Sequence, residues 1–369
     1  MRYYIIAGEA SGDLHGSNLI KKLHLVDGNA TIRCWGGNLM ESAGAVLAKH
    51  YRDLAFMGFV EVLSHLGTIM KNFSFCKKDI HQFHPDAIIL IDYPGFNLRI
   101  AKWAHANGYK VIYYISPQIW AWKENRAKLI RQCVDKMLVI LPFEKAFYEK
   151  WNYEVEYVGH PLIEVIKNAK EKGTGNSITE GKIIALLPGS RKQEILHKLP
   201  IMLKMIRHFP DYKFVIAQAP SIDEEKLQSM LKGYNQVLLV RDRTYDLLQQ
   251  STAALVTSGT ATLETALFGV PQIVCYKGSA LSYLLAKQLV KVKYISLVNL
   301  IMNKEIVKEL IQNDLNENNL KRELEKVLEE DNRQKMKSDY HLLWERLDEG
   351  DASLQAARSI FSFLNESNT

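Results

Sequence analysis

The sequence is poor in cysteine and has no long apolar run. Its four cysteines are scattered over 369 residues without the paired spacing of a zinc site, so we expect reduced, buried thiols. They are Cys34, Cys76, Cys133 and Cys275. No stretch reaches the roughly 18 uninterrupted apolar residues that a membrane-spanning helix needs. The opening residues, MRYYIIAGEASGD, lack a signal-peptide cleavage pattern, and we therefore expect a cytoplasmic protein.

The chain is longer than one compact core usually allows, which predicts two domains. Its 47% hydrophobic and 24% charged residues are typical of a soluble globular protein. Strand-like runs alternate with helical ones, and this predicts two α/β, Rossmann-like domains with parallel sheets and a cleft between them. The expected segments are 1–167 for the first domain, 168–181 for a polar linker, 182–330 for the second domain and 331–369 for helices that return to the first.

The stretch TSGTATLE joins a predicted buried strand to a helix through small residues. Ser258 can cap the helix, which we expect to begin near Gly259 or Thr260, and free backbone N–H groups at such a start bind phosphate. One turn later, the carboxylate of Glu264 can accept hydrogen bonds from the paired hydroxyls of a sugar. The segment therefore predicts a nucleotide-sugar site, although an ordinary strand-to-helix turn has the same pattern.

A second strand-to-helix junction, IIALLPGSRKQEI, carries Ser190 and Arg191. The guanidinium of Arg191 offers forked donors that match phosphate oxygens and stays charged at neutral pH. A cation near a helix start is unfavourable without an anion, because the helix dipole is positive there. A bound diphosphate would supply that anion, and a surface arginine is the alternative.

Two loops of the first half place acids after predicted strands. GEASGD carries Glu9, Ser11 and Asp13, and Asp13 alternatively caps the following helix. The loop lacks the GxGxxG pattern of a dinucleotide site, which weakens a dehydrogenase interpretation. In AIILIDYPGFN, Asp92 directly follows a buried strand, where a general base is needed. A hydrogen-bonded turn acid before Pro94 is the alternative.

Basic residues gather between positions 99 and 131, where seven lysines or arginines face one acid in a chain of net charge +6. Within this stretch, SPQIWAWKENR interleaves Trp120 and Trp122 with Lys123 and Arg126. Such a set can hold a phosphate beside an apolar chain or stack on single-stranded nucleic acid. Core packing of one tryptophan and a solvated helix face are the alternatives.

The segment Phe56–Phe73 repeats apolar residues at helical spacing. Its predicted apolar face is usually a buried stripe. Lys71 on its flank and Lys77 and Lys78 beyond it also permit a helix that lies on a bilayer surface. The apolar face consists of Phe59, Val62, Leu63, Leu66, Ile69, Met70 and Phe73.

Nine segments together resemble the lipid A disaccharide synthases, inverting glycosyltransferases of the two-Rossmann-domain, GT-B type. In order along the chain they are AGEASGD, MGFVEVL, the ID-x-P-x-FN segment, SPQIWAW, LPFEKAFY, VGHPL, LLPGSR, TSGTATLE and SLVNL. The resemblance implies transfer of 2,3-diacylglucosamine from UDP-2,3-diacylglucosamine to 2,3-diacylglucosamine 1-phosphate, with UDP released and no metal cofactor. It implies that Asp92 is the general base and that Glu264 holds the ribose. Ser190, Arg191 and the Gly259–Thr260 helix start would stabilise the departing UDP, and Asn299 would lie on the nucleotide side.

The resemblance also implies peripheral association with the inner face of the cytoplasmic membrane through Phe56–Phe73, and it allows a homodimer. Many members of the family carry a second acid where this chain has Gly95. Asp92 would then act alone or with help from Glu9 or Asp13. Two other interpretations stay open: a different UDP-sugar transferase or epimerase of the same fold, and a nucleic-acid-binding protein, for which no recognised motif accompanies the charge.

Overall fold

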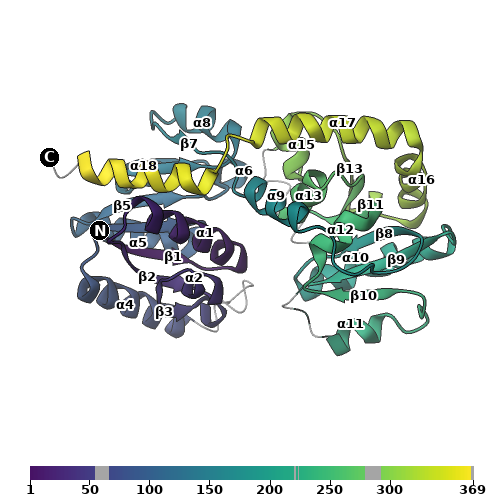
Figure 1. The fold of residues 1–369 in the computed structure, drawn as a ribbon, viewed down its shortest axis with the longest axis horizontal. Coiled ribbons are helices and arrows are strands. Elements are labelled where there is room, and N and C mark those ends of the chain that lie inside the picture. The colour runs from purple at the N-terminus through teal and green to yellow at the C-terminus, as the bar shows by residue number, and fades with distance from the viewer. Residues whose placement is uncertain (55–65, 220–221, 223, 279–291, 367–369) are drawn as a thin grey trace. The chain divides into compact units, whose positions relative to one another are not determined.

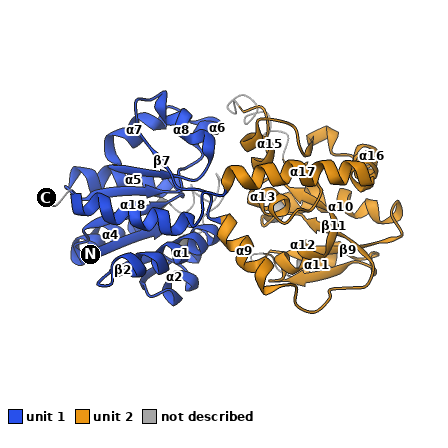
Figure 2. Ribbon diagram, turned by 45° about the horizontal axis from the view of Figure 1, so that its top comes forward, with its two compact units in different colours: residues 1–161, 348–369 blue, residues 162–347 orange. Residues whose placement is uncertain are grey.

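The computed structural model describes residues 1–54, 66–219, 222, 224–278 and 292–366. The chain forms two compact units, drawn in different colours in Figure 2. Unit 1 comprises Met1–Pro161 and Asp348–Thr369, and unit 2 comprises Leu162–Leu347. The chain thus leaves unit 1, builds unit 2 and returns.

Unit 1 is built on a seven-stranded sheet in the order β3-β2-β1-β4-β5-β6-β7, in which all neighbouring strands are parallel. All of β4 and nearly all of β1 are buried, as expected for strands that are covered on both faces. The strands are β1 (Arg2–Ala7), β2 (Thr31–Gly36), β3 (Val46–His50), β4 (Ala87–Ile91), β5 (Lys110–Tyr114), β6 (Lys136–Val139) and β7 (Glu156–Tyr157).

The helices of unit 1 alternate with its strands, as the sequence predicts. One core cluster joins α4, α5 and α7 to the sheet through side chains such as Phe73, Phe96 and Ile130. Helix α18 packs against α1, and the two lie side by side in Figure 1. The helices are α1 (Ala10–Val26), α2 (Asn38–Ser42), the 3-10 turn η1 (Tyr51–Leu54), α4 (Leu66–Phe83), α5 (Pro94–Ala106), α6 (Ile119–Trp122), α7 (Arg126–Cys133), α8 (Pro142–Glu149) and α18 (Ala352–Glu366).

Unit 2 repeats this plan with a six-stranded parallel sheet in the order β10-β9-β8-β11-β12-β13. Its central strands β8 and β11 end in runs of buried apolar residues. The strands are β8 (Lys182–Leu187), β9 (Tyr212–Gln218), β10 (Leu238–Arg241), β11 (Ser251–Thr257), β12 (Gln272–Tyr276) and β13 (Lys308–Ile311).

The helices of unit 2 include parts of two predicted segments. The predicted linker, 168–181, contains the end of α9 and the approach to β8. Of the predicted segment 331–369, α17 belongs to unit 2 and α18 to unit 1. The helices are α9 (Leu162–Lys172), α10 (Lys192–Leu203), the 3-10 turns η2 (Lys204–Arg207) and η3 (Gln312–Asp314), α11 (Glu224–Met230), α12 (Thr244–Gln250), α13 (Thr260–Leu267), α15 (Leu297–Met302), α16 (Glu317–Leu328) and α17 (Glu330–Leu347).

The predicted fold class is confirmed: both sheets are parallel and both alternate with helices. The expected state of the cysteines also holds, because all four are buried, free thiols.

Candidate active site

Each sheet has one point at which its strand order reverses. This point lies between β1 and β4 in unit 1 and between β8 and β11 in unit 2. Helices that follow two such strands run on opposite faces of the sheet, and ligands of α/β proteins bind there, at the carboxyl ends of the strands. The loops after these four strands carry the predicted residues Glu9, Asp92, Arg191 and Ser258. Within each unit, the fold therefore brings two predicted loops to one switch point.

Asp92 directly follows β4, and its backbone is strained. Asp92 (φ 42°) and Tyr93 (φ 49°) both take the left-handed conformation, which costs a non-glycine residue on the order of 1–3 kcal/mol. Three hydrogen bonds hold Asp92: its amide donates to the carbonyl of Ile115 at 3.2 Å, and its carbonyl accepts from the Tyr113 hydroxyl at 2.5 Å and the Asn97 side-chain amide at 2.8 Å. The surroundings therefore impose a conformation that the residue alone would avoid.

The carboxyl group of Asp92 is suited to accept a proton at neutral pH. The residue is half-buried, and burial, followed by the negative charge of Glu9, raises its pKa to about 7. A general base works best when its pKa lies near the working pH. Glu9 is itself half-buried and precedes α1 without a side-chain capping bond. The two acids predicted from separate motifs thus act on one another electrostatically.

Gly8 lets these two loops approach closely. A Cβ atom at this position would lie 2.3 Å from the ring of Tyr93, so no larger residue fits without a shift of that ring. The left-handed Tyr93 thereby packs on the loop that follows β1. This close approach explains why GEASGD begins with glycine, although the φ of Gly8 is ordinary.

Ser11 and Asp13 have different environments on α1. Ser11 is exposed in the first turn. Asp13 is 4% exposed, and its carboxylate accepts backbone hydrogen bonds from Gly37 at 2.8 Å, Leu39 at 3.3 Å and Met40 at 3.1 Å. Asp13 therefore lies inside α1 and satisfies the start of α2, instead of capping the helix that follows its own loop.

The two tryptophans of SPQIWAW are separated by burial. Trp120 is 7% exposed, and its indole N–H donates to the buried carboxylate of Glu144 at 3.2 Å. Trp122 is 44% exposed, with the Lys123 ammonium 4.3 Å and the Arg126 guanidinium 5.7 Å from its ring centroid. The surface aromatic group of this segment is Trp122, and Trp120 belongs to the core.

The predicted apolar face over Phe56–Phe73 is only partly within the described residues, because positions 55–65 lie outside them. In the described part, Phe73 is 6% exposed and stacks on Phe96, with ring centroids 4.4 Å apart. Met70 is 60% exposed, and Phe75, which was not part of the predicted face, is 44% exposed. Helix α4 therefore presents apolar side chains both to the core and to its outer surface.

In unit 2, Arg191 is the N-cap residue of α10, makes no side-chain capping hydrogen bond and is 62% exposed. Its guanidinium donates to Glu194 at 3.0 Å, and the other carboxylate oxygen of Glu194 accepts from Lys198 at 3.3 Å. Lys198 is 1% exposed and also donates to the Thr257 hydroxyl at the end of β11. Burial, the largest influence, lowers the pKa of Lys198. Lys198 thus ties the start of α10 to the end of the neighbouring strand.

The predicted start of α13 is confirmed, since the helix begins at Thr260 after the N-cap residue Gly259. The predicted capping role of Ser258 is wrong: its hydroxyl donates to the carbonyl of Ile295 at 2.9 Å, and the N-cap makes no side-chain hydrogen bond. Gly259 (φ 144°) has a backbone conformation that favours glycine. The first amides of α13 are therefore presented by glycine without a competing side-chain cap.

Glu264 lies on α13, one turn from its start, and is half-buried. One carboxylate oxygen accepts from the Tyr245 hydroxyl at 2.9 Å. Burial raises the pKa of Glu264, and the hydrogen bond from Tyr245 acts in the opposite direction. Tyr245 thereby orients the carboxyl group.

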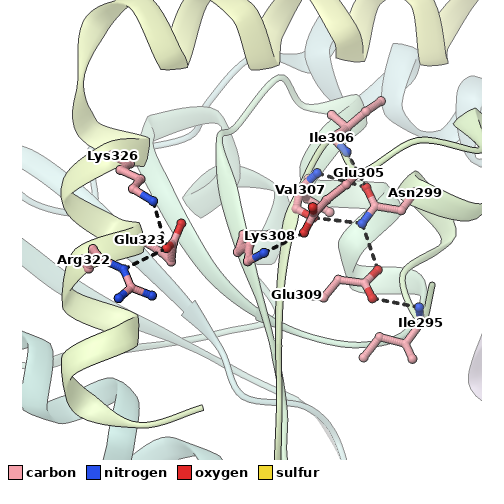
Figure 3. Close-up of polar contacts among 10 residues, drawn as sticks. All are labelled: Ile295, Asn299, Glu305, Ile306, Val307, Lys308, Glu309, Arg322, Glu323 and Lys326. Carbon is pink, nitrogen blue, oxygen red and sulfur yellow. Dashed lines mark hydrogen bonds and ion pairs between the residues drawn. The ribbon is translucent and has the colours of Figure 1, made fainter. Parts of the chain in front are cut away.

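Asn299 is fully buried, and its side chain bonds only within unit 2 in the contacts that Figure 3 draws. Its oxygen accepts from the amides of residues 306 and 307, at 2.7 and 3.0 Å, and its amide donates to the Val307 carbonyl at 2.8 Å and to Glu309 at 2.9 Å. Glu309 also accepts from the amides of Ile295 and Ser296. Asn299 and Glu309 therefore fix the segment whose carbonyl receives the Ser258 hydroxyl.

Four residues of the sites were not predicted. Asn97 lies within the ID-x-P-x-FN segment, so the sequence marked its position but did not indicate its role. Tyr113 is the next-to-last residue of a buried strand, Lys198 resembles any lysine on a helix, and Glu309 lies in a short strand, so nothing local marked these three. Their contacts depend on strand order, which the sequence pattern does not specify.

The described residues contain neither a metal-binding cluster nor a membrane-spanning helix. Over the described ranges, no group of three or more His, Cys, Asp or Glu side chains is arranged to hold a metal ion. Among the helices of the described part of the chain, none is both long and apolar enough to cross a membrane.

A family model described as lipid-A-disaccharide synthetase matches residues 3–360. The lipid-A-disaccharide synthase of Trichlorobacter lovleyi is 40% identical over 336 residues, which cover 89% of this chain and 88% of that protein. That of Geobacter metallireducens is 36% identical over 375 residues, which cover 99% of this chain and 98% of that protein.

Solved structures resemble the fold over nearly the whole chain. A co-structure of Staphylococcus aureus MnaA with UDP has a TM-score of 0.73 at 12% identity, covering 99% of this chain and 97% of that chain. The UDP-GlcNAc 2-epimerase of Neisseria meningitidis, bound to UDP-GlcNAc, has a TM-score of 0.69 at 13% identity, covering 99% and 100%. At such low identity, these likenesses establish the fold alone.

Proposed function

The chain belongs to the lipid-A-disaccharide synthetase family, and from this premise we propose how its residues divide the work of a glycosyl transfer. The protein is a glycosyltransferase with a UDP-sugar donor. It transfers 2,3-diacylglucosamine from UDP-2,3-diacylglucosamine to 2,3-diacylglucosamine 1-phosphate, and the products are the β-1,6-linked disaccharide 1-phosphate and UDP.

We assign the acceptor to unit 1 and the proton transfer to Asp92. Its carboxylate takes the proton of the acceptor's 6-hydroxyl while that oxygen attacks the anomeric carbon of the donor. One displacement breaks the bond to UDP and inverts the anomeric centre. The raised pKa of Asp92 supports this assignment, because a carboxyl group with an ordinary pKa is a weaker base at neutral pH.

We assign UDP to unit 2. Negative charge grows on the diphosphate as the bond to the sugar breaks, and Arg191, Ser190 and the Gly259–Thr260 start of α13 supply hydrogen-bond donors to it. Tyr245 holds one oxygen of Glu264, and the other accepts from the ribose hydroxyls. Asn299 is a positioning residue in this scheme, because its side chain is engaged by the protein backbone and Glu309.

Asp13 and Trp120 also act through other groups. Asp13 holds the start of α2 beside the loop of Glu9 and Ser11, and Trp120 fixes the segment that leads to Lys123 and Arg126. The negative charge of Glu9 raises the pKa of Asp92 across the switch point. These assignments leave Asp92 as the single group that exchanges a proton with substrate.

We propose that the transfer needs no divalent metal ion, because a guanidinium and a helix start already supply positive charge to the diphosphate. The enzyme would work at the inner face of the cytoplasmic membrane, held peripherally through Phe56–Phe73. The exposed Met70 and Phe75 on α4 support an apolar contact with lipid. A homodimer is compatible with this scheme, and light scattering of the pure protein would measure it.

The observation that carries the proposal, together with the family membership, is the place of Asp92 at the switch point of unit 1, where β4 ends beside β1 and the loop of Glu9. The decisive test incubates pure protein with both substrates, with and without chelator, and measures disaccharide and UDP. We expect disaccharide and UDP to form, and the amount of each product to be the same with and without chelator. A product that needs metal would overturn the metal proposal alone. An altered donor sugar without any disaccharide would favour an epimerase of the same fold.

A further inference from the structure

Two cations share one exposed indole in unit 1. Trp122 ends α6, and the side chains of Lys123 and Arg126 lie 4.3 and 5.7 Å from its ring centroid. Arg126 also begins α7, where the helix dipole adds positive charge. The segment therefore concentrates positive charge around an aromatic surface that is 44% exposed.

This arrangement costs free energy in the empty protein. Burial lowers the pKa of Lys123, and the neighbouring charge of Arg126 lowers it further. Two like charges at one place repel each other, and an anion between them would reverse that cost. Glu124 is the acid adjacent in sequence, and one carboxylate does not neutralise two cations.

The cluster and the proposed base follow neighbouring strands. The cluster comes after β5, which pairs with β4 in parallel, so both loops leave the same edge of the sheet. Tyr113, in β5, donates its hydroxyl hydrogen to the Asp92 carbonyl. Burial is the main cause that raises the pKa of this hydroxyl and Asp92 adds to it, while Arg126 acts in the opposite direction. Arg126 and Asp92 thus both lie within electrostatic reach of Tyr113.

We propose that Lys123 and Arg126, supported by the Trp122 ring, bind the phosphomonoester of the acceptor. This inference rests on the proposed function, because that reaction supplies a phosphorylated acceptor. A phosphomonoester carries a charge of about −1.5 to −2 at neutral pH, which two cations match. The Arg126 fork can donate two parallel hydrogen bonds to phosphate oxygens, and Lys123 adds a point charge. The indole holds both cations by cation–π attraction.

The test compares two acceptors in detergent micelles: 2,3-diacylglucosamine with and without its 1-phosphate. In Lys123→Ala/Arg126→Ala, kcat/KM for the phosphorylated acceptor should fall about 100-fold, from the loss of two charge-assisted contacts. For the unphosphorylated acceptor it should change less than about threefold, as should the KM of the donor. An equal loss with both acceptors would overturn the proposal.

The matched control is Lys128→Ala/Arg131→Ala, which removes the same amount of charge from α7, the helix that Arg126 begins. These side chains contact Trp151 instead, through a ring contact and a backbone hydrogen bond. The control should keep the preference for the phosphorylated acceptor. Melting temperatures of both variants verify that they fold. Arg126→Lys, which keeps the charge and loses the fork, should give an intermediate loss.

Two further measurements separate other outcomes. If the wild-type protein forms no disaccharide, the proposed function fails, and binding of the two monosaccharide lipids, followed by Trp fluorescence, still tests the phosphate site. Vesicles with and without anionic lipid test membrane headgroups as the source of phosphate. Weaker vesicle binding by Lys123→Ala/Arg126→Ala together with an unchanged preference between acceptors would assign the cluster to the membrane and overturn the proposal.

Discussion

The two sheets share one strand order over six strands, to which unit 1 adds a seventh, but the residues at their switch points differ in kind. In unit 1, the residues with left-handed backbones are Asp92 and Tyr93, which carry side chains although this conformation favours glycine. In unit 2, the residues with positive φ in the loops after β8 and β11 are Gly189 and Gly259. In the proposed mechanism, the strained residue of unit 1 carries the carboxyl group that exchanges a proton, whereas glycine in unit 2 lets backbone amides face the diphosphate. We therefore propose that one topology serves a proton acceptor in one unit and a diphosphate site in the other.

The strongest way to break this comparison is to remove the proton acceptor. Asp92→Asn should lower kcat about 10³-fold, because a general base contributes roughly 10²- to 10⁴-fold. The binding of UDP, measured by calorimetry, should be unchanged, since the substitution lies in unit 1. Asp86→Asn is the matched control: it removes a carboxylate from the residue before the same strand, where Asp86 accepts from the Arg2 amide. Turnover retained by Asp92→Asn would remove Asp92 from the mechanism.

The same variant has a second signature in stability. Because the folded pKa of Asp92 is raised, the folded protein binds this proton more tightly than the unfolded chain, and the contribution of Asp92 to stability falls as the pH rises from about 4 to about 7. Above pH 7, Asp92→Asn should be more stable than the wild type by about 1–2 kcal/mol, a value reduced for partial exposure. Denaturant titrations at pH 8 and pH 4 measure the difference, which should vanish at the lower pH.

The second prediction concerns the anion site of unit 2. Arg191→Ala should lower kcat/KM about 10²-fold, because one donor to the developing charge is lost. UDP should bind more weakly as well, unlike in Asp92→Asn. Arg241→Ala, at the end of β10, removes an exposed arginine that pairs with Asp242 and serves as the control. Unchanged UDP binding by Arg191→Ala would show that the diphosphate lies elsewhere.

The third prediction sharpens the link between the two acids of unit 1. The wild-type kcat/KM should rise with pH around a midpoint of about 7, because only the ionised Asp92 accepts a proton. Glu9→Gln removes the negative charge that raises this pKa, so the midpoint should move down by up to about one unit. A pH profile of initial rates measures the shift. A midpoint that stays in place would mean that burial alone sets the pKa.

The smallest effect is expected at Gly95. A side chain there meets open space, and the residue lies in the first turn of α5, where an acid is favourable. Gly95→Asp should raise stability by about 0.5 kcal/mol and change kcat less than about threefold. Gly28→Asp, also in open space, controls for added charge. A tenfold rise in kcat would show that the second acid of other family members matters.

Much of the fold was predictable, because alternation of apolar strands and helices is a local pattern. The positions of the loops were predictable too: the strand before Asp92 ends at Ile91, and α13 begins at Thr260. The strand order was not predicted, and with it the pairing of the loops at two switch points. Order depends on contacts between residues far apart in sequence.

Side-chain roles were less predictable than positions. Trp120 and Trp122 differ in burial although both lie on the single turn of α6, and Glu144 receives the hydrogen bond of the buried Trp120. Serine is a common helix-capping residue, yet the Ser258 hydroxyl donates its hydrogen bond to a backbone carbonyl of a distant segment. The carboxylate of Asp13 accepts a hydrogen bond from the backbone amide that precedes α2, 24 residues further along the chain. In each instance a tertiary partner replaced the local one that the motif suggested.

The return of the chain to unit 1 has a consequence for synthesis on the ribosome. Helix α18 covers α1 with buried residues such as Ala356 and Ile360, yet all of unit 2 precedes it in the chain. Unit 2 can therefore fold as soon as it emerges, while unit 1 waits with part of an apolar surface uncovered until residues 348–366 follow. Unit 1 is therefore the first unit to be translated and the last to complete its folding.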